Sequence, residues 1–135
     1  MANGRGTFSL DTPSILITDD DRRLRETIRD VLVPKGYRIL MAGDGVEAFE
    51  IVQHEQIDLV LLDMHMPRMT GLQALRLVKK FKSLLPCILM SAEMNDTLRA
   101  EAEEAEVFTI LRKPVGRLNL TEVVQQALYR TYGWG

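Results

Sequence analysis

Residues 58–71 read DLVLLDMHMPRMTG, and this stretch indicates the fold most directly. The run 59–62 is apolar and long enough to cross a small domain as a fully buried strand. Asp63 follows at once, so a carboxylate stands at the end of that strand. The proline and the final glycine mark a loop, and Thr70 with Gln73 is typical of the capping box that begins a helix. An ionised carboxylate at the end of a buried strand costs free energy of folding unless a functional site uses it. Open α/β sheets bind their ligands at the carboxyl ends of the strands, where Asp63 stands.

The rest of the chain alternates between strand-like and helix-like patterns. Short apolar runs predict four further strands at residues 15–18, 37–42, 86–90 and 107–111. Apolar residues at helical spacing predict helices through Leu24, Ile28, Val31 and Leu32; Val46, Phe49 and Val52; Leu72, Leu75, Val78 and Phe81; and Leu120, Val123, Val124, Ala127 and Leu128. Residues 96–106 predict a weakly anchored acidic helix. The expected N-terminal caps are Asp21, Asp44 with Glu47, and Asn119 with Glu122. Five strands alternating with five helices predict an α/β fold, a doubly wound five-stranded parallel sheet with right-handed crossovers.

Composition narrows the classes of function. The chain has 135 residues, a net charge of −2, 46% hydrophobic and 27% charged residues, which fits one globular domain. The acidic balance argues against nucleic-acid binding, which usually needs a basic surface. No apolar run approaches the ~18 residues that span a bilayer, and no signal-peptide pattern is present, so we expect a cytoplasmic protein. The single cysteine, Cys87, is expected to be an inert core thiol. We expect a flexible leader at 1–13, the domain at 14–131 and a short tail at 132–135.

Polar residues follow four of the five expected strands. They are Asp19 and Asp20, Asp63, Ser91, and Lys113. Clustered carboxylates repel one another, and a hard divalent cation such as Mg²⁺ relieves that repulsion. A hydroxyl and an ammonium opposite the acids complement a bound phosphoryl group. Each residue alone has an ordinary interpretation, as a turn acid, a turn hydroxyl or a solvated lysine, but their joint placement at the strand ends favours a functional site.

These motifs together resemble a known family. The segments Ile-Leu-Ile-Thr-Asp-Asp-Asp at 15–21, Asp-Met-His-Met-Pro at 63–67 with Gly71, Ser-Ala-Glu at 91–93 and Lys-Pro at 113–114 resemble the receiver domains of two-component response regulators. The resemblance covers about 14–131. It implies a CheY-like, flavodoxin-like (βα)5 fold of strand order 2-1-3-4-5 and a stand-alone phosphoacceptor switch in a phosphorelay.

The resemblance also implies roles for particular residues. Asp63 would be the phosphoacceptor, and Ser91 and Lys113 would contact phosphoryl oxygens. Mg²⁺ or Mn²⁺ would be bound by Asp20, Asp63 and the backbone carbonyl of His65, with Asp19 acting through water. The Lys113–Pro114 peptide bond is cis in the family, which X–Pro bonds allow at low cost.

Two positions depart from the family pattern. An aromatic residue usually stands three residues before the lysine, where this chain has Ile110. Phe108 lies two residues earlier and, by the alternation of a strand, is expected on the same face, where it would take over part of the role of the missing aromatic residue. The candidate switch residues are therefore Ser91, Ile110 and Phe108. His65 occupies the metal-carbonyl position, often an asparagine; we expect His65 and Glu93 to tune the lifetime of the phosphoryl group.

The expected partners are a histidine kinase or phosphotransfer protein and a downstream protein that the sequence does not identify. Neither nucleic acid nor membrane is expected, and the chain is expected to be a monomer or a weak phosphorylation-dependent dimer. Arg22, Arg25 and Arg29 share the polar face of the first helix and are candidates for kinase recognition, or an ordinary solvated face. We expect no turnover enzyme, only self-catalysed phosphorylation and dephosphorylation. Alternatives are a phosphatase-type enzyme with Asp63 as nucleophile, a non-phosphorylated receiver-like scaffold, and a fragment of a longer regulator.

Overall fold

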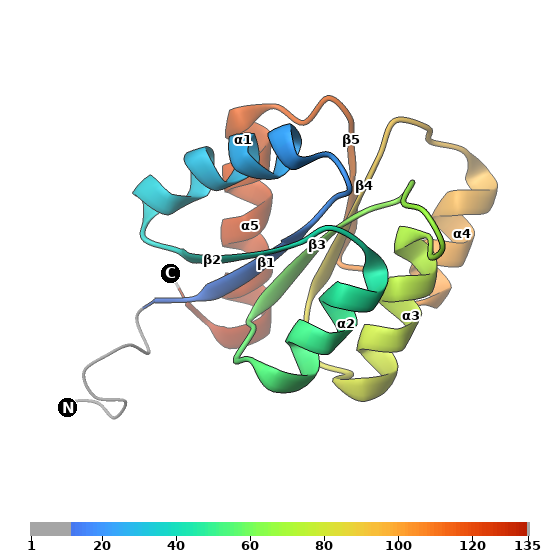
Figure 1. Cartoon of the computed structure of the whole chain (residues 1–135), viewed down its shortest axis with the longest axis horizontal. Helices are drawn as coiled ribbons and strands as arrows, with labels where there is room; N and C mark the ends of the chain where they lie inside the picture. The colour runs from blue at the N-terminus through green and yellow to red at the C-terminus, as the bar shows by residue number, and fades with distance from the viewer. Residues whose placement is uncertain (1–11, 135) are drawn as a thin grey trace.

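The computed structural model describes residues 12–134 as a five-stranded parallel sheet between two layers of helices (Figure 1). The strand order is β2-β1-β3-β4-β5, which confirms the predicted fold class and order. The strands are β1 (Ser14–Thr18), β2 (Arg38–Ala42), β3 (Leu59–Asp63), β4 (Cys87–Ser91) and β5 (Thr109–Arg112). The helices are α1 (Arg22–Leu32), a short 3₁₀ turn η1 (Val33–Lys35), α2 (Gly45–His54), α3 (Gly71–Phe81), α4 (Asp96–Glu104) and α5 (Arg117–Tyr132).

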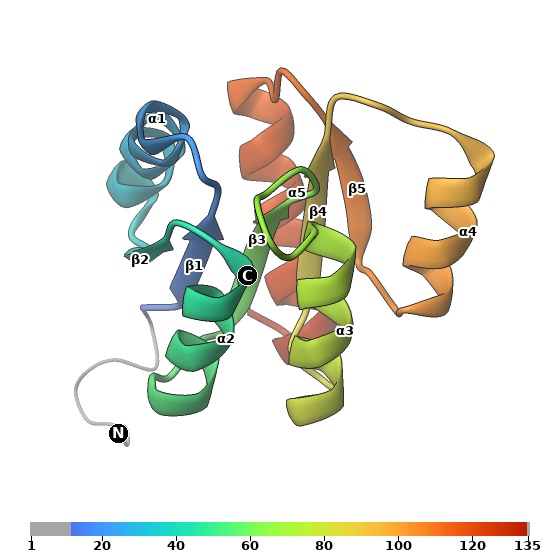
Figure 2. The same ribbon diagram turned by 45° about the vertical axis from the view of Figure 1, so that its right-hand side comes forward.

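Two apolar clusters, one on each face of the sheet, hold the layers together. Helices α1 and α5 cover one face, and α2, α3 and α4 cover the other (Figure 2). Strands β1, β3 and β4 are buried along their whole length, which explains their continuous rather than alternating apolar sequences. Cys87 lies in this core, and burial raises the pKa of its thiol to about 12, as expected for an inert thiol.

Three of the predicted helix caps are present. The Asp21 carboxylate accepts hydrogen bonds from the backbone at the start of α1, and that of Asp44 does so at the start of α2. Thr70 and Gln73 form the reciprocal capping box of α3. Because the box fixes where α3 begins, it also fixes the length of the loop that follows Asp63.

The structure corrects several of the predicted helix caps and buried helix positions. Helix α5 begins at Arg117 with Gly116 at its N-cap and no side-chain cap, so the predicted cap at Asn119 is wrong. Val46 is exposed, because α2 turns Gly45, Ala48 and Val52 toward the sheet instead. Phe81 is also half exposed; it lies at the last residue of α3, where it meets an aromatic ring of α2 edge to face.

The ends of the chain are described in part. The predicted leader falls almost wholly on residues 1–11, which lie outside the described residues. At the other end α5 continues to Tyr132, whose ring stacks on Trp134 with centroids 4.2 Å apart. Within residues 12–134, no helix combines the length and apolar content that crossing a membrane requires.

Candidate functional site

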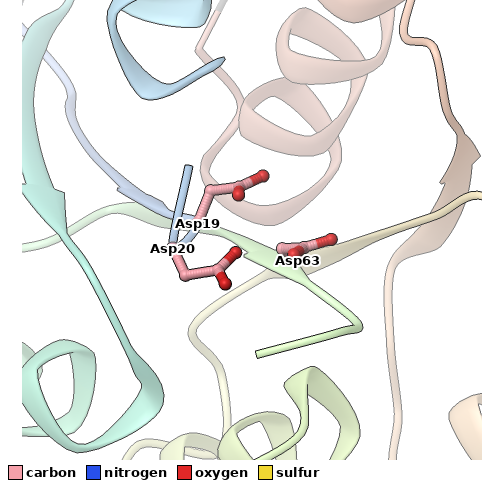
Figure 3. A group of neighbouring side chains, drawn as sticks. All are labelled: Asp19, Asp20 and Asp63. Carbon is pink, nitrogen blue, oxygen red and sulfur yellow. The ribbon is translucent and has the colours of Figure 1, made fainter. Parts of the chain in front are cut away.

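Three carboxylates meet where β1 and β3 end. Asp19 and Asp20 follow β1, and Asp63 is the last residue of β3, the strand hydrogen-bonded to β1 (Figure 3). One oxygen from each carboxylate lies within 4.8 Å of those of the other two. Asp19 and Asp63 are only 1% and 3% exposed, whereas Asp20 is open to solvent. The parallel topology thus brings together residues that are more than forty positions apart in the sequence.

Lys113 is the cation of this site. Its ammonium lies 2.8 Å from Oδ1 of Asp63 and 3.0 Å from Oδ2 of Asp19. Burial lowers the pKa of Lys113, but the hydrogen bonds with Asp63 and Asp19 outweigh it, so the pKa stands above its ordinary value. Lys113 therefore remains charged in the site. The Lys113–Pro114 peptide bond that follows is cis, in agreement with the resemblance.

Asp19 sits in a denser network than its neighbours. Its carboxylate accepts the backbone N–H of Asp21 at 2.9 Å, and its carbonyl oxygen accepts Nη1 of Arg25 at 2.6 Å. Burial raises the pKa of the Asp19 carboxyl, the contacts with Asp21 and Lys113 oppose that change, and the charge of Asp63 adds to it; the net shift is upward. A bound cation would stabilise the ionised form of the Asp19 carboxyl.

Arg25 has a contact that the sequence does not reveal. The sequence pattern places it on a polar helix face, whereas the structure points its guanidinium back at the end of β1. The only feature of the sequence that could predict this contact is the position of Arg25 in the first turn of the helix that follows Asp19 and Asp20.

Ser91, the last residue of β4, is fully buried and engaged in a local turn. Its hydroxyl donates to the carbonyl of Glu93 at 2.7 Å and accepts the backbone N–H of the same residue at 3.1 Å. The Glu93 side chain lies 3.3 Å from Nε2 of His65, which belongs to the loop after β3. The two side chains are 74% and 60% exposed, so this bridge joins the loops after β3 and β4 at the protein surface.

The loop that carries Asp63 into α3 is tightly constrained. The Gly71 N–H donates to the carbonyl of Met64 at 2.9 Å, and a Cβ at Gly71 would lie 2.3 Å from the carbonyl oxygen of Asp63. Arg68, in the left-handed region at φ 68°, forms an ion pair with Asp44 at the N-cap of α2. No local sequence pattern predicts this contact, because it joins residues that are 24 positions apart.

Two of the candidate switch residues, Ile110 and Phe108, lie on opposite faces of the sheet. Ile110 packs with the cluster under α2, α3 and α4, whereas Phe108 packs with the cluster under α1 and α5. The predicted shared face is therefore wrong. Strand alternation does not extend to Phe108, because β5 begins only at Thr109. The ring of Phe108 instead faces the guanidinium of Arg130, 6.0 Å from its centroid.

The site thus combines a buried carboxylate beside an ammonium with an acidic group suited to a hard cation. A carboxylate held in this way is a nucleophile, and the ammonium offsets the negative charge of an incoming anion. Lys113 contacts Asp19 and Asp63 directly, and Asp20 places a carboxylate oxygen within 4.8 Å of theirs.

Comparisons with known proteins point the same way. Residues 15–125 match the family model described as the response regulator receiver domain. The response regulator MprA of Mycobacterium leprae is 35% identical over 117 residues, which are 87% of this chain and 51% of that protein. The chain therefore spans about half the length of the curated relatives it matches.

Solved structures show the same likeness. A response regulator receiver domain protein from Clostridium thermocellum has 30% identity and a TM-score of 0.79, covering 87% of this chain and 95% of that one. The chemotaxis protein CheY4 of Vibrio cholerae has 25% identity and a TM-score of 0.83, covering 87% and 99%.

Proposed function

This chain belongs to the response regulator receiver domains, and from that membership we propose that Asp63 is its phosphoacceptor. The donor is the phosphohistidine of a histidine kinase or phosphotransfer protein, and the signal leaves by contact with a downstream protein. The observation that supports this assignment is the contact between the buried carboxylate of Asp63 and the ammonium of Lys113, at 2.8 Å. It supplies both a nucleophile and the charge that an arriving phosphoryl group requires.

The acid cluster fits a divalent metal. Oxygens from Asp19, Asp20 and Asp63 converge within 4.8 Å, and carboxylate oxygens are the preferred ligands of Mg²⁺ and Mn²⁺. We assign Asp20, Asp63 and the backbone carbonyl of His65 as direct ligands and Asp19 as a ligand through water. When bound, the ion supplies positive charge that offsets the carboxylates and the phosphoryl oxygens.

The chemistry then follows from the residues. A carboxylate oxygen of Asp63 attacks phosphorus, and the bond from phosphorus to the donor imidazole breaks, with its electron pair remaining on the imidazole nitrogen. Lys113 neutralises an oxygen of the transferred group. The Ser91 hydroxyl leaves its local turn to donate to another, which couples the acyl phosphate to the loop after β4.

The product is a modified form of the chain rather than a released compound. We therefore describe the domain as a switch that catalyses its own phosphorylation and dephosphorylation. A phosphatase of the class that uses an aspartate nucleophile needs a second acid two residues later, where this chain has His65.

Labelling with acetyl phosphate and Mg²⁺ tests the assignment. Intact-mass measurement should show one added phosphoryl group, lost in base, and absent from Asp63→Asn or when the metal is chelated. Asp58→Asn is the matched control, since Asp58 is a buried carboxylate at the opposite end of the same strand and should leave labelling intact. Undiminished labelling of Asp63→Asn would disprove the assignment.

A further inference from the structure

The charges of α3 and α4 are sharply segregated. Residues 64–92 contain no aspartate or glutamate but five basic residues, whereas residues 93–106 contain six acids and a single arginine. The two helices are neighbours on one face of the sheet (Figure 2). A basic helix and an acidic helix thus lie side by side on the surface of one domain.

The outer face of α3 has both charge and an apolar floor. Arg76 and Lys80 are exposed one turn apart, with the half-buried Leu77 between them. A shallow hollow of about 450 Å³ runs along the flank of this face nearer to α2, where Arg68 pairs with Asp44. Its lining is Arg68, Met69, Gln73, Arg76, Leu77 and Lys80. Across residues 12–134, neither Arg76 nor Lys80 has an ion-pair partner, so their charges are available to another molecule.

The outer face of α4 is the complement. Glu101 and Glu104 are exposed, and they too lack an ion-pair partner in the described part of the chain. Arg99 and Glu103 line a separate hollow beside β5. Helical spacing then places Glu101 and Glu104 on the opposite flank of α4, the flank nearer to α3.

We propose that the α3–α4 face binds a second copy of this chain about a twofold axis. In that arrangement Arg76 and Lys80 of each copy meet Glu101 and Glu104 of the other, so both charge patches are neutralised at once. A twofold contact is self-complementary and closes, which favours a discrete dimer over a fibre. The small side chain of Ala100, exposed on α4, allows the acidic helix of one copy to approach α3 of the other closely.

Charge complementarity favours this occupant over other molecules. The chain carries a net charge of −2, so two copies repel at long range and attraction must come from locally opposed patches. The patch on α3 has two basic residues, and the patch on α4 has two acidic ones. A second copy therefore supplies a complementary patch for each, and no other molecule is needed. The proposal does not depend on phosphorylation of Asp63.

Sedimentation equilibrium at low ionic strength, without a phosphoryl donor, tests the proposal by charge exchange. Arg76→Glu with Lys80→Glu makes both faces acidic, and Glu101→Lys with Glu104→Lys makes both basic. Each variant alone should raise the dissociation constant of the dimer about tenfold or more. An equimolar mixture of the two should form a heterodimer within about threefold of the original constant, because each acidic face then meets a basic one.

Arg22→Glu with Arg23→Glu is the matched control, since it makes the same charge change on the exposed face of α1 on the other side of the sheet. It should leave the dissociation constant unchanged. Circular dichroism verifies that each variant is folded. A chain that stays monomeric at low salt, reversals without effect, or a mixture that fails to associate would each overturn the proposal.

Discussion

Asp19 is the carboxylate of the site whose ionisation the fold opposes. Its folded pKa is raised, so the charged form is less stable in the folded chain than in the unfolded one. The cost is present at neutral pH, where the carboxylate is ionised, and it disappears as the pH falls below the ordinary aspartate pKa of about 4. At this position the chain gives up stability to keep an acid beside Asp63.

Replacing that acid should stabilise the protein. In metal-free buffer at pH 7 we expect Asp19→Asn to raise the midpoint of thermal unfolding by a few degrees, which corresponds to roughly 1 kcal/mol. The gain should shrink toward pH 4, where the original carboxyl becomes protonated. Circular dichroism melts across this range measure it, with Asp30→Asn on exposed α1 as a control of little effect. A lower midpoint at pH 7 would show that the contacts with Lys113 and Asp21 outweigh burial.

The bridge between His65 and Glu93 should slow hydrolysis of the aspartyl phosphate. Both side chains are largely exposed and belong to the loops that follow Asp63 and Ser91, so we expect the bridge to restrict the approach of water to the site. We expect Glu93→Ala to accelerate loss of the phosphoryl group about threefold to tenfold, a change of roughly 1 kcal/mol in the barrier. Decay of labelled protein after removal of the donor measures the rate. His65→Ala should act in the same direction, and combining the two should add little if the bridge is the cause.

Local sequence patterns predict some of the residues of the site but not others. Asp19, Asp20 and Asp63 are predictable because each stands at the end of a buried apolar run, and parallel strands place their ends at one edge. The contact between Arg68 and Asp44 is not, since it depends on how two loops from separate units approach one another.

Among the elements, the junction of β3 and α3 tolerates the least change. A Cβ at Gly71 would lie 2.3 Å from the carbonyl oxygen of Asp63 and 2.9 Å from a methyl group of Leu89, so the end of β3 must shift. We expect Gly71→Ala to cost roughly 1–3 kcal/mol, more than the ~1 kcal/mol that alanine gains in a helix. It should also slow labelling of Asp63, because the acceptor moves with the strand.

Urea unfolding and labelling rates measure both effects. Gly43→Ala is the control, since its Cβ would meet only ordinary contacts at 3.5 and 3.7 Å. That variant should be neutral or slightly more stable. Equal behaviour of the two variants would mean that the junction relaxes without cost.

Element boundaries show where sequence patterns stop being informative. The cap at Asp44 and the capping box at Thr70 were predictable because both caps lie beside the first apolar turn. The box expected between Asp44 and Glu47 is only half formed, since the Glu47 carboxylate accepts the N–H of Gly43 instead. Asn119 with Glu122 offers the same pattern, yet α5 begins earlier, where the loop from β5 arrives. The local pattern allowed either start, and the path of the preceding loop decides between them.

At the scale of the whole molecule, α4 and β5 are the parts most ready to respond. Only Leu98 and Ala102 of α4 are buried, and the helix carries clustered acids, so displacing it costs little. Phosphorylation should shift α4 and β5 without an inward-turning ring at position 110, because Ile110 is branched and stiff at χ1. Phe108 cannot replace that ring, since it packs on the other face.

Amide chemical shifts with and without a beryllofluoride mimic of the phosphoryl group measure the response. Residues 95–112 should move along with the loop after Asp63. Shifts confined to that loop would place the output surface elsewhere. The Ile110→Tyr variant tests the role of position 110 separately from the movement of α4. It should alter the affinity for a partner only if the side chain at position 110 controls the output surface.

The stacked pair of Tyr132 and Trp134 at the end of α5 determines which structural changes the intrinsic fluorescence of this protein can detect. Trp134 is the only tryptophan, and its partner Tyr132 donates its hydroxyl to the carbonyl of Asp58 at 2.8 Å, at the amino end of β3. Asp63 lies at the other end of that strand. Intrinsic indole fluorescence therefore reports whether the last helix stays docked under the sheet, and a phosphoryl group on Asp63 changes the emission only if its effect travels the full length of β3.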